Sequence, residues 1–168
     1  MLQRISLLVL VALVVAVACA PAQAQESAQI QATATVVSSL AVNGTHDLVF
    51  GSVTPGVNKA VDKLTSADAG HFEISGNGTD EVQVAFTTLP NQLADGGNTL
   101  TLAFNATDAS YGTVQGTATA LDPSAGVTTD LVAGALHIWL GGTVQPTAGQ
   151  TGGSYSANVV MEVTLTGN

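Results

Sequence analysis

Basic side chains are nearly absent from this chain of 168 residues, which carries 3 Lys and Arg residues against 12 Asp and Glu residues. Beyond residue 24 only Lys59 and Lys63 remain as bases beside all 12 acidic residues, which gives that part a formal net charge of −10. Without a basic cluster, nothing attracts nucleic acid phosphates or an anionic membrane surface. We therefore expect a soluble, acidic protein with no nucleic acid partner and no stable insertion into a membrane.

Cysteine is equally scarce, because the single one, Cys19, lies in the N-terminal 24 residues. Residues 1–24 have the pattern of a secretory signal peptide, with Arg4 in a basic start, an apolar run over residues 5–18 and a small-x-small cleavage site at Ala22 to Ala24. We expect a secreted protein whose mature chain begins at Gln25 and reaches the extracellular space or cell surface, through the periplasm if the source is Gram-negative. Lipidation of Cys19 is the alternative.

The exported part has no cysteine, so its fold must be stabilised without a disulfide. No charge run, proline-rich linker or change of composition divides residues 25–168. A chain of this length can bury one hydrophobic core and does not need two. We predict a single β-sandwich domain over residues 25–168.

Beyond the leader, the sequence lacks apolar residues at helical spacing. Short runs rich in Val, Leu, Ile and Phe are instead separated by Gly, Thr, Ser, Asn and Asp, which is typical of an all-β sandwich. We predict an immunoglobulin-like Greek-key sandwich of about seven to nine strands. The predicted strands cover residues 29–42, 47–50, 71–75, 81–88, 99–105, 136–140 and 155–165, and residues 52–70 and 106–133 have room for further edge strands such as 112–120.

The last of these strands has the most regular alternation. One dry face is formed by Tyr155, Ala157, Val159, Met161, Val163 and Leu165. So long a strand needs a neighbour at its edge, and that neighbour comes either from the same chain or from another subunit.

Several segments carry a family resemblance when taken in order. These are residues 32–37, 47–51 (Asp-Leu-Val-Phe-Gly), 71–76, 136–144 and 152–157 (Gly-Gly-Ser-Tyr-Ser-Ala). Together they resemble a family of secreted bacterial β-sandwich domains of unknown function, related in pattern to spore coat protein U and to the pilins of archaic chaperone-usher fimbriae. The likeness covers nearly all of the exported chain, although this chain lacks the cysteine pair of many such pilins.

The resemblance implies a fimbrial or surface building block that self-associates into a fibre, with a periplasmic chaperone and an outer-membrane usher as partners. In such pilins an N-terminal segment of one subunit fills a sheet position in the next. The candidate segment here is residues 28–37, in which one face is formed by Ala28, Ile30, Ala32, Ala34 and Val36. The alternative is that these residues are the first strand of a sandwich that is complete within its own chain.

Catalytic residues are not evident. The three histidines, His46, His71 and His137, lie at strand starts or on outward faces and share no metal-ligand spacing, and no serine lies in a nucleophile elbow. The acidic loops 77–81 and 91–98 offer oxygen ligands for calcium but do not match an EF-hand, so we interpret them as solvated turns. We expect no enzyme activity, no cofactor and no metal site.

Trp139 is the one candidate ligand-binding side chain, because it falls on the outward face of its predicted strand. An exposed indole can stack on a sugar, which would make the protein a monomeric secreted adhesive or carbohydrate-binding module. Packing beneath a loop or in the second sheet is the alternative. Our leading hypothesis remains an exported, non-enzymatic fibre subunit that assembles by strand pairing.

Overall fold

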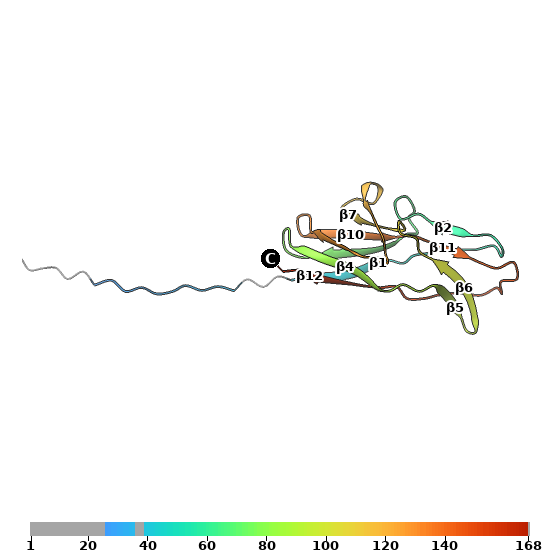
Figure 1. Cartoon of the computed structure of the whole chain (residues 1–168), viewed down its shortest axis with the longest axis horizontal. Coiled ribbons are helices and arrows are strands. Elements are labelled where there is room, and N and C mark those ends of the chain that lie inside the picture. Colours follow the sequence, from blue (N-terminus) through green and yellow to red (C-terminus); the bar gives the residue numbers. More distant parts are fainter. Residues whose placement is uncertain (1–25, 36–38, 168) are drawn as a thin grey trace, which may run out of the picture. The chain divides into compact units, whose positions relative to one another are not determined.

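The computed structural model describes residues 26–35 and 39–167 (Figure 1). The chain divides into two units, residues 1–36 and residues 37–168. In the first unit, the described residues 26–35 form no helix or strand, and all of them are exposed. The predicted signal peptide, Cys19 and Val36 lie outside the described residues.

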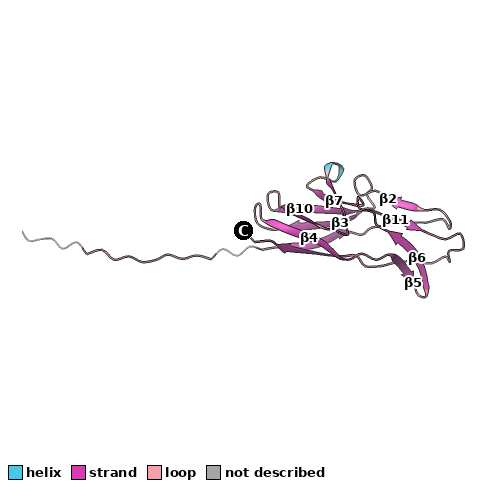
Figure 2. Cartoon of the chain, in the orientation of Figure 1, coloured by secondary structure: helices cyan, strands magenta, loops and turns pink. Residues whose placement is uncertain are grey.

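The second unit is built from β-strands (Figure 2). Its one helical element within residues 39–167 is a short 3-10 turn, η1 (Gln115–Thr117). No helix in the described part of the chain is long and apolar enough to cross a bilayer. The 12 strands are β1 (Ala41–His46), β2 (Lys59–Val61), β3 (Gly70–Ser75), β4 (Glu81–Thr88), β5 (Gln92–Asp95), β6 (Asn98–Ala103), β7 (Ala109–Gly112), β8 (Thr119–Leu121), β9 (Val127–Asp130), β10 (Ala135–Leu140), β11 (Gly142–Gln145) and β12 (Val160–Leu165).

The strands pair into three sheets, each of them antiparallel throughout. Sheet A has the order β1-β3-β10-β7-β8, sheet B the order β2-β11-β6-β5, and sheet C the order β12-β4-β9. The predicted all-β class is confirmed, with more strands than the predicted seven to nine.

Sheets A and C share the larger of two hydrophobic clusters, which we call the first core. Every second residue of the central strands is buried in it, because successive side chains of a strand point to opposite faces. Sheet A contributes Ile74, Leu136, Ile138 and Leu140, and sheet C contributes Val82, Val84 and Met161. Burying one such side chain stabilises the fold by about 1.5–3 kcal/mol, so this cluster, which has more buried side chains than the other, contributes the larger share of the burial energy.

Sheet B carries a smaller cluster, the second core, built from Phe50, Val61, Ala69, Leu100, Leu102 and Val144. The chain enters this sheet from β10 through Gly141, which separates β10 from β11. A side chain at Gly141 would collide with the backbone carbonyl oxygen of Val61, so the close approach of the two segments requires glycine there.

Four predicted strands are confirmed. The strand predicted over residues 81–88 has the bounds of β4, and those predicted over 71–75, 99–105 and 136–140 match β3, β6 and β10 to within two residues. The two long loops hold additional strands, β2 in the first and β7, β8 and β9 in the second.

Other predicted strands are wrong. The strand expected over residues 29–42 begins at Ala41, and the described residues before it have no strand structure. Residues 47–50 form a loop whose Phe50 is anchored in the second core, so their apolar character reflects that anchor and not a ladder. The edge strand suggested over residues 112–120 is interrupted by η1.

Candidate functional site

The last strand is shorter than its alternating pattern predicts. β12 covers residues 160–165 and pairs with β4, placing Met161 opposite Phe86, Val163 opposite Val84 and Leu165 opposite Val82. Residues 155–159 precede the strand and make one isolated bridge, between Ser156 and Ala94. Their period of two is not matched by continuous pairing, and they lie where the chain passes from β11 of sheet B to β12 of sheet C.

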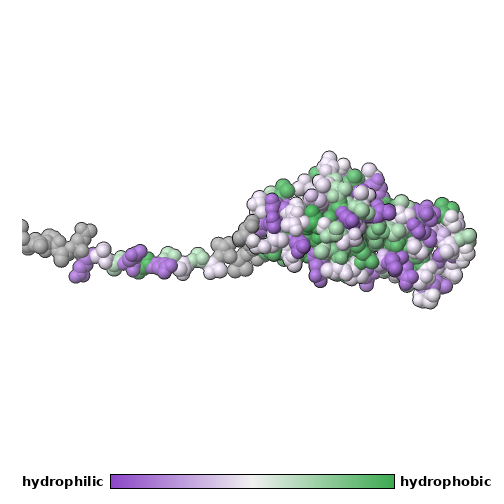
Figure 3. All heavy atoms as spheres, viewed as in Figure 1, coloured by the Kyte–Doolittle hydropathy of each residue, from purple (hydrophilic) through white to green (hydrophobic). Residues whose placement is uncertain are grey.

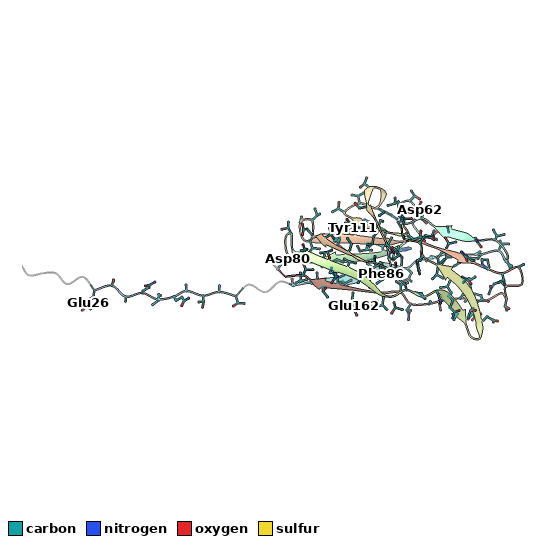
Figure 4. The ribbon with its side chains drawn as sticks, in the orientation of Figure 1. Glu26, Asp62, Asp80, Phe86, Tyr111 and Glu162 are labelled. Atoms are coloured by element: carbon teal, nitrogen blue, oxygen red, sulfur yellow. The ribbon has the colours of Figure 1, made fainter. Side chains whose placement is uncertain are left out.

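The alternating row of this segment therefore serves both cores. Tyr155 packs against the second core, whereas Val159, Met161 and Val163 pack in or against the first. Ala157 is exposed and Leu165 is 37% exposed. Glu162, on the other face of β12, is exposed, and Figure 4 shows it at the rim of the domain.

Sheets A and C, which share the first core, are joined at one side by the chain itself. There, the end strand of sheet A is β8 and the end strand of sheet C is β9, and the five residues 122–126 connect them directly. The opposite ends of the same two sheets are β1 and β12, each six residues long and, within residues 26–35 and 39–167, each paired on one side only. We call the edges of β1 and β12 the open side.

The open side borders the first core and exposes apolar side chains. Leu40, directly before β1, and Val163 of β12 both pack against that core. Val160 is 43% exposed and Val42 is 36% exposed, although both lie in strands. Figure 3 shows hydrophobic residues among hydrophilic ones on one face of this unit.

The described residues among those predicted to pair between subunits form no strand. Ala28, Ile30, Ala32 and Ala34 lie in the exposed residues 26–35, and Val36 lies outside the described residues. Ile30 is 91% exposed. These four residues form no strand, and whether the segment pairs within its own chain or with another copy stays a prediction.

The structure also gathers side chains that the sequence left scattered. On the outer face of sheet A, Trp139 of β10 lies opposite His71 of β3 in the ladder, and His137 lies opposite Glu73. His71 Nε2 and His137 Nδ1 are 3.0 Å apart. The ring centroids of His71 and Trp139 are 5.2 Å apart and the rings are almost parallel, at 8°.

A β-bulge adds a third strand to this group. The register of β1 and β3 shifts between Gly44 and His46, which leaves Thr45 as the extra residue. Bulges re-aim side chains, and here the Thr45 hydroxyl lies 2.6 Å from His71 Nδ1 and 3.2 Å from the His71 carbonyl oxygen. His46 faces elsewhere and donates from Nδ1 to the carbonyl oxygen of Ala69, at 3.1 Å.

The environment of His71 disfavours its charged form. Burial lowers the pKa of His71 below its ordinary value of 6.5, and the charge of His137 lowers it further. The charge of Glu73 raises the pKa of His71, and the charge of His46 lowers it by a smaller amount. His71 is therefore held neutral over a wider pH range than a free histidine.

Trp139 does not offer a flat exposed surface. Its indole is 7% exposed and lies in the ladder between His71 on β3 and Ser110 on β7. Ser110 is fully buried, and its hydroxyl has no hydrogen-bond partner in the part of the chain that the structure describes. A sugar-stacking role needs an accessible indole face, which this packing does not provide.

Within residues 26–35 and 39–167, no three His, Cys, Asp or Glu side chains are grouped so that they could hold a metal ion. Sequence reasoning missed the His71–His137 contact because it depends on the pairing of β3 with β10, strands separated by 59 residues of chain. The only sequence signal was their outward parity.

No protein-family model matches this sequence, and a search of the curated proteins finds no significant relative.

Proposed function

We propose that this chain is an exported, non-enzymatic structural subunit of a cell-surface fibre, whose copies assemble by adding a β-strand of one copy to the next. The observation that supports this most strongly is the open side, where two six-residue strands bordering one core are each paired on one side only. Unpaired strand edges present N–H and C=O groups that another strand can bind.

The N-terminal segment, residues 28–37, is the strand that we propose is added. Its alternate residues are apolar, so that one face can meet a core while the other, with Gln29, Gln31 and Thr33, stays in water. In the described part of this segment those apolar side chains are exposed, and Ile30 is the largest of them. At about 3.3 Å per residue it is long enough to run beside both six-residue edges.

This proposal includes an immunoglobulin-like sandwich whose edge strand is supplied by another copy. β1 and β12 would then be the two strands that border the added one. A periplasmic chaperone that covers the open side before assembly, and an outer-membrane usher that exchanges it for the next subunit, belong to the same proposal. Covering the edge would prevent premature pairing, since open edges readily pair with other chains.

The alternative, a monomeric adhesive or carbohydrate-binding module, depends on Trp139 as a stacking platform. With the indole 7% exposed, the packing does not favour that function. We therefore do not propose it.

Electron microscopy and sedimentation of the purified chain from Gln25 onward test the proposal. We expect fibres, or oligomers that grow with concentration, and we expect a synthetic peptide of residues 26–37 to bind the protein and shorten them. The matched control is the same peptide carrying Ile30→Asp, which should neither bind nor compete. A chain that stays monomeric at all concentrations and ignores both peptides would contradict the proposal.

A further inference from the structure

The facing ring nitrogens of His71 and His137 are close enough to share one hydrogen atom in a hydrogen bond. Their ring centroids are 5.1 Å apart, while the facing nitrogens, Nε2 of His71 and Nδ1 of His137, are 3.0 Å apart. The distance between the ring centroids exceeds the distance between the facing nitrogens by nearly the sum of the two ring radii. The facing nitrogens therefore lie near the line that joins the centroids, so the rings meet edge to edge, with their planes 19° apart. An N–H on one ring then points at the lone pair of the other, as in a good hydrogen bond.

Thr45 determines which nitrogens carry hydrogen. Its hydroxyl has one hydrogen, which it donates to the His71 carbonyl oxygen at 3.2 Å. The hydroxyl oxygen then accepts from the Nδ1–H of His71 at 2.6 Å. Nε2 of His71 is left as an acceptor, so His137 donates from Nδ1. The three side chains connect β1, β3 and β10 across the outer face of sheet A.

We propose that Thr45, His71 and His137 form an acid-sensitive clasp that ties the edge strand β1 to the centre of sheet A. One proton added to the pair leaves a single hydrogen between the two rings, in a charge-assisted hydrogen bond. A second proton must enter the gap, where two N–H groups would face each other at 3.0 Å. The second protonation therefore breaks the clasp.

The charges around His71 support this order of protonation. The groups whose charges act on His71 are His137 on β10, Glu73 on its own strand and His46 on β1. β7, on the far side of β10, contains Tyr111 and no acidic or basic residue. The loop that ends at Ala69, whose carbonyl oxygen accepts the hydrogen bond from His46, contains three further charged residues, Asp62, Lys63 and Asp68. Burial and the neighbouring histidine both lower the pKa of His71, so the second protonation is delayed to a pH below 6.5.

The clasp makes the fold weaker in acid. Between 6.5 and the lower pKa of His71 in the folded protein, the unfolded chain binds more protons than the folded one. The unfolding equilibrium constant therefore rises by up to about tenfold for each unit by which the pH falls within that window. Below the folded pKa of His71 it changes no further. The clasp needs only one chain and does not depend on assembly, although β1 also borders the open side.

Nuclear magnetic resonance of the intact, ¹⁵N-labelled chain tests the clasp directly. At pH 8 we expect a scalar coupling across the hydrogen bond between Nε2 of His71 and Nδ1 of His137, with His137 in its Nδ1–H form. The coupling should survive the first protonation and disappear at the second, with apparent pKa values that belong to the pair. Absence of the coupling, with two histidines that titrate independently near pH 6.5, would overturn the proposal.

Amide hydrogen exchange of β1 gives a second readout. After correction for intrinsic exchange rates, we expect the protection of β1 to fall by up to about tenfold per pH unit as the second proton binds. His71→Gln should remove this pH dependence, and His46→Gln, which leaves the clasp intact, should preserve it. If His71→Gln fails to fold, the titration of the unmodified chain still decides, and a β1 that stays equally protected in acid refutes the clasp.

Discussion

Ile30→Asp in the chain from Gln25 onward should abolish self-association without unfolding the domain. Ile30 is 91% exposed, so burial against the open side of a neighbour would remove almost all of its apolar surface from water, a gain of about 2–3 kcal/mol. Aspartate forfeits this gain and adds a desolvation cost of at least about 2 kcal/mol. The loss of about 4 kcal/mol corresponds to an association about a thousandfold weaker.

The matched control is Gln31→Asp, which adds the same charge one residue away on the other face of the segment. Its side chain should remain in water, so association should stay within about threefold of that of the parent chain. Analytical ultracentrifugation over a wide concentration range measures both variants, and circular dichroism confirms that each is folded. Equal weakening by the two substitutions would show that charge, and not a buried face, controls assembly, which refutes the reasoning.

Three further predictions concern the domain alone. Ile138→Ala, in the first core, should lower the free energy of unfolding in urea by about 2–5 kcal/mol, whereas Val114→Ala, at an exposed position, should change it by less than about 0.5 kcal/mol; similar losses would contradict the assigned core. Gly141→Ala should lower the thermal unfolding midpoint because the added carbon meets a backbone oxygen, while Gly149→Ala, where an added carbon meets nothing within 4 Å, should not. A larger loss from Gly149→Ala than from Gly141→Ala would be inconsistent with the described crossing into sheet B. Trp139 fluorescence should resist quenching by iodide in the folded protein, and quenching as complete as in the unfolded chain would disprove its burial.

Strands in the centre of the sheets were predictable from sequence because burial on one face enforces strict alternation. Residues 81–88 show this best, since Val82 and Val84 are fully buried and Pro90 follows the strand. Short strands were not predictable, because four residues such as 142–145 of β11 contain too few alternations to separate them from a loop.

Alternation also overstated structure where the chain is extended but unpaired. Residues 29–35 and 155–159 alternate as strands do, yet neither segment has a ladder partner that continues over its length. Pairing is a long-range property, which the period of one segment does not contain. The contact of His71 with His137 was hidden for the same reason, and the bulge that brings Thr45 to His71 has no local signature.

The central claim is that the open side accepts a strand from a second copy of this chain. A cryo-electron microscopy structure of the fibre tests it most directly. The account predicts residues 28–37 of one copy between β1 and β12 of its neighbour, with Ile30 turned toward the first core. A fibre in which both edges remain unpaired, or in which each copy's own N-terminal segment lies between them, would contradict it.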